Sequence, residues 1–120
     1  MKGTVKVENL KIYAYHGCME EEEIIGSDYI INIKAYCTLS KKAFADDITE
    51  TVNYVDLARI AEREMAVRSK LLECVAKRIT SSCMKEIALI EEIFVSISKV
   101  CPPINACLLY TSDAADEVQC

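Results

Sequence analysis

The most regular feature of the chain is an alternation of apolar and polar positions between residues 28 and 39. Asn32, Lys34 and Thr38 stand between apolar or small residues, which fill the other positions: Tyr29, Ile31, Ile33, Ala35, Cys37 and Leu39. Successive side chains of a β-strand point to opposite faces, so a period of two is typical of a strand with one buried face. We therefore predict a strand over residues 28–39.

Residues 4–15 predict a second strand whose alternation changes phase. The apolar residues fall into two pairs of opposite parity: Val5 and Val7, then Leu10 and Ile12. One extra residue in a strand moves all later side chains to the other face. A β-bulge near Glu8-Asn9 would therefore bring both pairs to the core side. We expect the two strands to form a long antiparallel pair, joined by an acidic loop.

Helical spacing replaces alternation after residue 53. Asn53 has the character of a helix N-cap, with Asp56 placed to complete a capping box, and Ser69 is predicted to cap a second helix. Apolar residues recur three and four positions apart in both segments, which indicates one buried face on each helix. They are Leu57, Ile60, Ala61 and Met65 in the first, and Leu71, Leu72, Val75, Ala76, Ile79 and Cys83 in the second.

A third strand is predicted over residues 91–99, with Ile93, Val95 and Ile97 facing inward, and Pro102-Pro103 ends it. The order β-β-α-α-β predicts an α+β fold, an antiparallel sheet with two helices on one face. Such an open sheet has two bare edges. Because exposed edges are normally paired or protected, we expect the protein to form a homo-oligomer.

Composition narrows the classes of function. The chain has 120 residues, a net charge of −5 and no basic stripe, which argues against a nucleic-acid partner. We see neither a signal peptide nor an apolar run long enough for a membrane, and expect a cytoplasmic protein. Seven cysteines without regular spacing favour free thiols. His16 is the one histidine, which excludes a His-rich zinc site, and no metal is expected.

Four motifs occur in order along the chain, and together they resemble those of the dihydroneopterin aldolase family. They are Tyr13-Ala14-Tyr15-His16-Gly17 followed by Glu22 and Gly26; Thr51-Val52-Asn53-Tyr54; Leu71-Leu72-Glu73; and Lys99 followed by Pro102-Pro103-Ile104. Each motif alone is weak, whereas the ordered set over residues 4–105 is specific.

The resemblance implies the tunnelling fold (T-fold), in which several subunits close a β-barrel with the helices outside. It implies tetrameric rings, often stacked as homo-octamers, with active sites between adjacent subunits. The implied activity is an aldehyde-lyase of folate biosynthesis that splits 7,8-dihydroneopterin into 6-hydroxymethyl-7,8-dihydropterin and glycolaldehyde. The implied chemistry uses no metal, no organic cofactor and no Schiff base.

Two residues have the chemistry that a pterin lyase needs. Glu73, in the first turn of a helix, can accept both the exocyclic NH2 and the neighbouring ring N–H of a pterin. An ordinary acidic residue of a first turn is the alternative. Lys99 continues the inward parity of the third strand, where partial desolvation would let it act as general acid/base. The alternative is that the Lys99 side chain extends its ammonium group to water, and strand parity alone supports both interpretations equally. The adjacent Pro-Pro-Ile motif favours the catalytic role.

Four further residues take their roles from the resemblance. Tyr54 would relay a proton from the neighbouring subunit, and Glu22 would accept hydrogen bonds from the substrate side chain or a water. Val52 and Leu72 would offer backbone groups to the pterin. The alternative for Tyr54 is a ring that packs at the start of a helix. The alternative for Glu22 is a place in a run of solvated glutamates. His16 we interpret as a structural residue.

The resemblance breaks off near residue 106. The family continues into a final strand, whereas residues 107–120 resemble a translated frame of a sequencing adapter. We therefore expect residues 1–106 to form an incomplete domain, C-terminally truncated and lacking the last strand. Residues 107–120 would be a non-native or disordered tail, and activity of this chain would be doubtful. A divergent tail with a short Leu-Leu-Tyr-Thr strand is the alternative.

Two other functions compete with the aldolase. Epimerisation of dihydroneopterin or its triphosphate would use the same residues, although the basic cluster that a triphosphate would need is not evident. A non-catalytic pterin-binding module would keep Glu73 and lose Lys99 or Tyr54, and this chain has all three.

Overall fold

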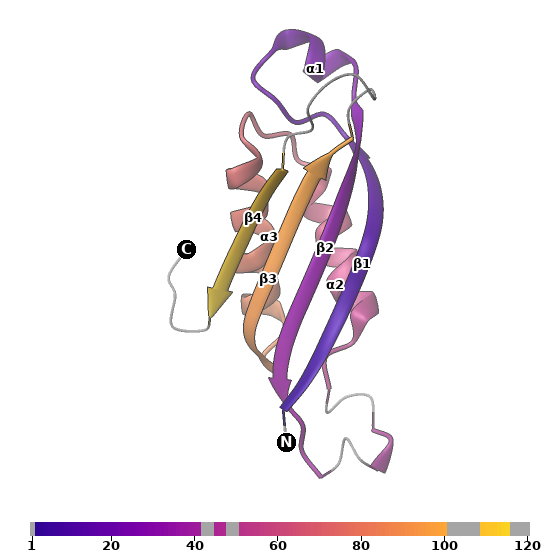
Figure 1. Cartoon of the computed structure of the whole chain (residues 1–120), viewed down its shortest axis with the longest axis vertical. Coiled ribbons are helices and arrows are strands. Elements are labelled where there is room, and N and C mark those ends of the chain that lie inside the picture. Colours follow the sequence, from indigo (N-terminus) through magenta and orange to yellow (C-terminus); the bar gives the residue numbers. More distant parts are fainter. Residues whose placement is uncertain (1, 42–44, 48–50, 101–108, 116–120) are drawn as a thin grey trace.

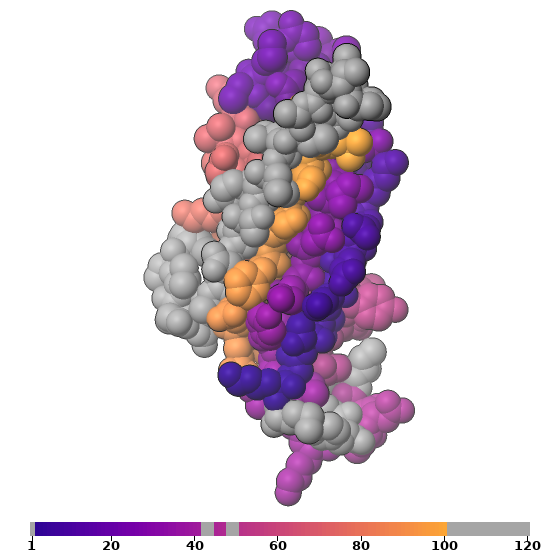
Figure 2. Space-filling model, viewed as in Figure 1, coloured from indigo at the N-terminus to yellow at the C-terminus, as the bar shows by residue number. Residues whose placement is uncertain are grey.

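The computed structural model describes residues 2–41, 45–47 and 51–100, together with the backbone of 109–115. Four strands form one antiparallel sheet in the order β1-β2-β3-β4. Helices α2 and α3 lie side by side against one face of it (Figure 1). None of the described helices lies on the other face, and the side chains of β1 to β3 are visible across it in Figure 2. The described part is thus the two-layer α+β arrangement that the element order predicts.

Strands β1 (Lys2–Ala14) and β2 (Ser27–Thr38) form the long antiparallel pair. The register shifts between Val7 and Leu10, and Asn9 has a φ of 57°, so the predicted bulge is confirmed. The Asn9 N–H is bound by the Asn32 side-chain oxygen at 2.8 Å, which replaces the partner that a bulge removes from the ladder.

The core lies between the sheet and the two helices. Strand β3 (Ile90–Lys99) pairs with β2, and its three predicted inward residues are fully buried: Ile93, Val95 and Ile97. The alternating residues of β2 from Tyr29 to Cys37 are buried beside them. Apolar faces of α2 (Tyr54–Met65) and α3 (Leu72–Glu86) close the core from the other side. The periodicities of two and 3.6 therefore assign most of the core correctly. Leu71 is the exception: it was predicted on the buried face of the second helix, but it is the N-cap of α3 and is 51% exposed.

The predicted helix starts are half correct. Asn53 is the N-cap of α2, and its side-chain oxygen accepts the Val55 N–H at 3.0 Å. Asp56 pairs with Arg59 at 3.8 Å rather than completing the predicted capping box. The prediction for Ser69 is wrong. The N-cap of α3 is Leu71, and the Ser69 hydroxyl instead accepts a hydrogen bond from Arg78.

Two segments carry secondary structure that the preferred interpretation of the sequence did not include, although the alternative for the second was a short Leu-Leu-Tyr-Thr strand. The acidic loop contains a short helix, α1 (Glu20–Ile24), consistent with the preference of carboxylates for the first turn of a helix. The expected absence of a last strand is wrong, because β4 (Leu109–Ala115) pairs antiparallel with β3. Residues 101–108, with Pro102-Pro103, lie outside the described residues. The adapter origin of residues 107–120 stays a prediction.

Candidate active site

A pocket of about 360 Å³ lies at the end of the sheet where α1 is located (Figure 1). Four elements and the loop before α1 meet there: α1, the start of β2, the start of α3 and the end of β3. Ten residues line it: His16, Gly17, Cys18, Glu22, Tyr29, Lys70, Leu71, Leu72, Glu73 and Lys99. Its volume falls within the ~300–1,000 Å³ range of small-molecule sites. Four of the six predicted site residues are therefore together in one concave surface.

Glu22 and Lys99 form an ion pair inside this pocket. The Lys99 Nζ donates to Glu22 Oε2 at 2.7 Å, and each side chain is about a quarter exposed. The hydrogen bond from Lys99 lowers the pKa of the Glu22 carboxyl, which keeps that group charged at neutral pH. Lys99 is placed by the inward parity of β3, and Glu22 by α1. A charged donor and a charged acceptor therefore stand in direct contact at the wall of the pocket.

Gly17 makes room for the Glu22 carboxylate. A Cβ at this position would lie 1.8 Å from Glu22 Oε2, and the φ of Gly17 is +142°. Side chains rarely tolerate either condition, so glycine is needed here for space and for backbone conformation. The second residue of the His-Gly motif is thus part of the pocket wall, a role that its sequence position alone did not reveal.

Glu73 and Leu72 form the opposite wall at the start of α3. Glu73 is in the first turn, as predicted, and its side chain is exposed at the pocket. Among the described residues, none forms an ion pair with the Glu73 carboxylate. The Leu72 side chain is buried, which leaves its backbone as the part that can face a ligand. The first N–H groups of a helix have no intrahelical partner, so this turn offers donors beside an acceptor.

His16 is buried beneath the pocket and has a structural role, as predicted. Its Nδ1 accepts the Ser69 N–H at 3.0 Å. Burial, followed by the nearby charge of Arg78, lowers the pKa of His16 to about 4. The imidazole is therefore neutral at physiological pH, and a neutral ring is what accepting the Ser69 N–H requires.

Tyr29 is a pocket residue that the sequence pattern assigned only to the core. Its ring is buried, while its hydroxyl donates to the His16 carbonyl oxygen at 2.9 Å. Burial raises the pKa of this phenol, so it stays protonated and able to donate. The antiparallel register places Tyr29 opposite Lys99, and this pairing was the available signal.

Tyr54 and Val52 do not belong to this pocket in the single chain. Val52 precedes α2 and Tyr54 is its first residue, and this end of α2 lies at the end of the molecule where β3 starts (Figure 1). Nine residue steps of β3 separate its two ends, about 30 Å at 3.3 Å per residue. Tyr54 is 64% exposed, and Val52 is buried.

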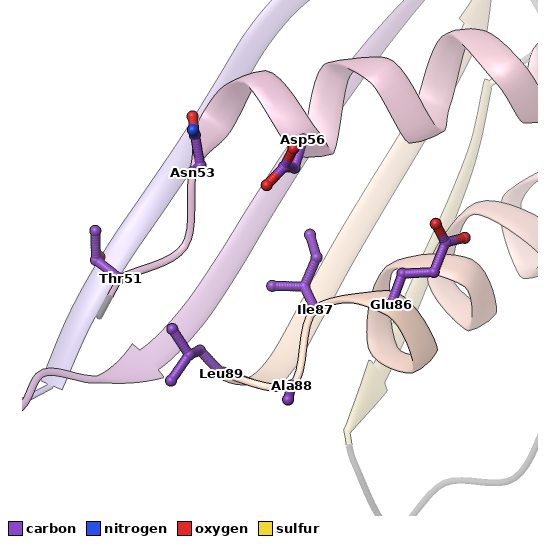
Figure 3. A pocket seen from close by; sticks show the side chains of 7 residues that line it. All are labelled: Thr51, Asn53, Asp56, Glu86, Ile87, Ala88 and Leu89. Atoms are coloured by element: carbon purple, nitrogen blue, oxygen red, sulfur yellow. The ribbon is translucent and has the colours of Figure 1, made fainter. Parts of the chain in front are cut away.

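A second pocket, of about 390 Å³, lies at that far end beside Asn53 (Figure 3). Thr51, Asn53 and Asp56 line one side of it and Ile87 and Leu89 the other, with the Asp56 side chain directed toward Ile87. The two ends of the molecule thus each carry part of the predicted site residues. Within the described part of the chain, no group of three or more His, Cys, Asp or Glu side chains is placed to hold a metal ion. None of the described helices is both long enough and apolar enough to cross a bilayer.

The profile of the dihydroneopterin aldolase (FolB) family matches residues 5–112. The chain belongs to the dihydroneopterin aldolase family. The family match covers the pocket, the three described helices and the strands from Val5 to Ser112. It includes residues 107–112 of the segment predicted to be a non-native tail.

Curated relatives give the same assignment. Dihydroneopterin aldolase of Methylorubrum extorquens is 35% identical over 114 residues, which span 93% of this chain and 87% of the relative. The Bacillus subtilis dihydroneopterin aldolase is 31% identical over 101 residues, with 83% and 84% of the two chains covered.

Solved structures share the fold at lower identity. An E. coli dihydroneopterin aldolase in complex with neopterin superposes with a TM-score of 0.85 and 19% identity, covering 94% of this chain and 99% of that one. A putative dihydroneopterin aldolase from Vibrio cholerae superposes with a TM-score of 0.81 and 17% identity, covering 94% and 97%. The predicted fold of one T-fold subunit, an antiparallel sheet with helices on one face, is thereby confirmed, and closure of a barrel by several subunits stays a prediction.

Proposed function

We propose that this protein is a lyase of folate biosynthesis that cleaves 7,8-dihydroneopterin into 6-hydroxymethyl-7,8-dihydropterin and glycolaldehyde. The observation that carries the proposal is the Glu22–Lys99 pair, which shares one small pocket with the carboxylate of Glu73. The family match and the curated relatives, each named dihydroneopterin aldolase, support the same activity.

The pocket supplies what a retro-aldol reaction on a dihydropterin needs. A hydroxyl of the substrate side chain loses its proton, the adjacent carbon–carbon bond breaks, and the electron pair passes into the ring C=N. The carbon left on the ring then takes up a proton, and glycolaldehyde leaves. Because the substrate contains its own electron sink, the protein needs to hold the ring and transfer protons.

Lys99 and Glu22 are the proposed proton-transfer groups. Lys99 would act as general acid/base, and Glu22 would accept hydrogen bonds from the substrate hydroxyls or from a water. The 2.7 Å contact between Lys99 Nζ and Glu22 Oε2 supports the assignment. A carboxylate that accepts a hydrogen bond from an ammonium group holds that group in one orientation. Both side chains lie partly desolvated at the pocket wall, where such contacts are stronger than in water.

Glu73 and Leu72 are the proposed pterin-binding residues. The Glu73 carboxylate would accept the exocyclic NH2 and the ring N–H together, and the Leu72 backbone would contact the same ring. An exposed carboxylate beside free helix N–H groups supports this pairing of acceptor and donor. A guanine-bound dihydroneopterin aldolase from Burkholderia, with 15% identity and a TM-score of 0.76, shows that a relative binds a ring with the same NH2 and N–H edge.

Tyr54 and Val52 would join the site from a neighbouring subunit of a homo-oligomer, a tetrameric ring or a stacked octamer. The ~30 Å between the two ends of one chain supports this, because Tyr54 cannot reach the Lys99 pocket of its own subunit. The exposed ring of Tyr54 and the two sheet edges, β1 and β4, are surfaces that such an assembly would use.

The proposal is tested by incubating the purified protein with 7,8-dihydroneopterin and measuring both glycolaldehyde and the epimer of the substrate. Glycolaldehyde as the main product supports the lyase. Epimer without glycolaldehyde would identify an epimerase, in which cleavage is followed by re-addition to the other face. Binding of neopterin without either product would identify a pterin-binding module. The control variant, Lys77→Met on the outer surface of α3, should leave the rate unchanged.

A further inference from the structure

The loop that leads to Glu22 is held by hydrogen bonds to one short segment before α3. Loop 15–19 runs from the end of β1 to α1, and segment 68–70 precedes Leu71. We propose that Arg68 is a positioning residue, which holds loop 15–19 so that Glu22 meets Lys99 at the pocket. This inference rests on the proposed role of the Glu22–Lys99 pair.

Arg68 binds three backbone carbonyl groups of the loop at once. Its Nε donates to the Tyr15 oxygen at 2.9 Å, and its Nη2 donates to the Gly17 oxygen at 2.8 Å. The same Nη2 reaches the Met19 oxygen at 3.3 Å. These carbonyls belong to every second residue of loop 15–19, so one guanidinium group fixes the path of the whole loop. Met19 is the residue directly before α1, and its N–H contacts Glu22 Oε1 at 3.4 Å.

The neighbours of Arg68 strengthen the same contact. The Ser69 N–H binds the His16 ring, and the Ser69 oxygen accepts the Gly17 N–H at 2.9 Å. The Cys18 thiol donates to the Lys70 oxygen at 3.4 Å. Loop 15–19 and segment 68–70 are therefore paired along their length, and each continues into one wall of the pocket: Glu22 on one side, Glu73 on the other.

The shape of the side chain explains why arginine is suited to this task. A guanidinium group has five N–H donors in a rigid plane, whereas the ammonium group of lysine is a single point with three donors. One point cannot donate with good geometry to three carbonyl groups that are spread over five residues of the loop. The charge of Arg68 also contributes to lowering the pKa of Glu22, so the residue acts on the same carboxylate by geometry and by electrostatics.

The test is a double-mutant cycle on the full chain with four proteins: wild type, Arg68→Met, Glu22→Gln and the double variant. The rates of glycolaldehyde release give kcat and KM for each, and neopterin titration gives the affinity. We expect Arg68→Met to lower kcat roughly ten- to a hundredfold, as a displacement of about 1 Å does at an active site. Neopterin affinity should change less than about threefold, because Glu73 is fixed by α3.

The decisive comparison is the effect of Arg68→Met in the Glu22→Gln background. If Arg68 acts through Glu22, the second substitution adds less than about a twofold loss, since interacting sites are not additive. Equal losses in both backgrounds, or no loss in the single variant, would overturn the proposal. Arg68→Lys should recover only part of kcat, and it replaces Arg68→Met in the cycle if the latter does not fold.

Two controls separate this proposal from the proposed function. Arg59→Met removes an exposed arginine of α2 that pairs with Asp56 at 3.8 Å, and should leave kcat unchanged. A wild-type protein without turnover would contradict the proposed function and, with it, this inference. An active wild type that is unaffected by Glu22→Gln would contradict the role of the ion pair. An active, Glu22-dependent enzyme with an additive Arg68 effect would overturn the Arg68 proposal alone.

Discussion

Replacing Gly17 by alanine should damage stability and activity through two separable effects. The φ of +142° lies in a region that is nearly restricted to glycine, and a side chain there costs about 1–3 kcal/mol of folding free energy. The new Cβ would also stand 1.8 Å from Glu22 Oε2, so the carboxylate must turn away. Lys99 would then lose its 2.7 Å partner, and we expect kcat to fall at least about tenfold.

The two effects can be measured apart by comparing Gly17→Ala in wild type and in Glu22→Ala. Removal of the Glu22 side chain abolishes the steric conflict and leaves the backbone strain. Denaturant unfolding should therefore show a smaller loss of stability in the Glu22→Ala background, and turnover should show almost no further loss. Gly3→Ala is the matched control, because a Cβ there meets the flexible Leu39 side chain at 3.0 Å and should leave kcat unchanged. Wild-type kcat in Gly17→Ala would refute the reasoning.

Two further predictions concern ionisation. Because His16 titrates near 4 when folded and near 6.5 when unfolded, its contribution to stability is complete above pH 6.5 and is lost as pH falls to about 4, on the order of 3 kcal/mol. The single imidazole C2–H signal in proton NMR should stay unshifted from pH 8 to pH 5, and a midpoint near 6.5 would contradict the burial argument. Lys99→Met should raise the lowered pKa of Glu22, because the hydrogen bond from Lys99 is its main cause. Carboxyl carbon NMR should show this rise. The variant should also lose the stability that the Glu22–Lys99 pair contributes above pH 4.5 in the wild type. In the wild type this contribution disappears as pH falls through the folded-state pKa of Glu22.

Sequence patterns located most of the fold because burial is periodic in both strands and helices. The alternation from Tyr29 to Cys37, the change of phase at Asn9 and the inward residues of β3 all have the predicted faces. The same parity places Lys99 at the pocket. These predictions succeed because a strand that buries one face has a single register that satisfies it.

The failures come from contacts between segments that are distant in the chain. Ser69 has the sequence of a helix cap, yet its backbone binds His16 and its hydroxyl accepts from Arg78. The Tyr29 ring fits the core pattern, and only the fold brings its hydroxyl to the His16 carbonyl. Segment 109–115 was preferentially assigned to a tail, with a short strand as the alternative, and the edge of β3 pairs with it. A local pattern contains no information about such partners.

The separation of Tyr54 from Lys99 agrees with the expectation that Tyr54 acts from a neighbouring subunit. The resemblance to a family placed both in one active site, and their strand and helix ends lie about 30 Å apart within one chain. A neighbouring copy would bring Tyr54 to the pocket, which makes assembly part of the proposed chemistry. Sequence alone supplies the residue types, and the geometry of the single chain supplies the reason why the proposed site would need a second copy.

The central claim is that one pocket divides its work between a binding carboxylate and a proton-transferring amine. The most direct test measures neopterin affinity and kcat in two variants, Glu73→Gln and Lys99→Met. We predict that Glu73→Gln weakens neopterin binding by more than about tenfold, since it removes a charge-assisted double hydrogen bond. Lys99→Met should abolish glycolaldehyde release while binding stays within about threefold. Unchanged affinity in Glu73→Gln, or retained turnover in Lys99→Met, would contradict the account.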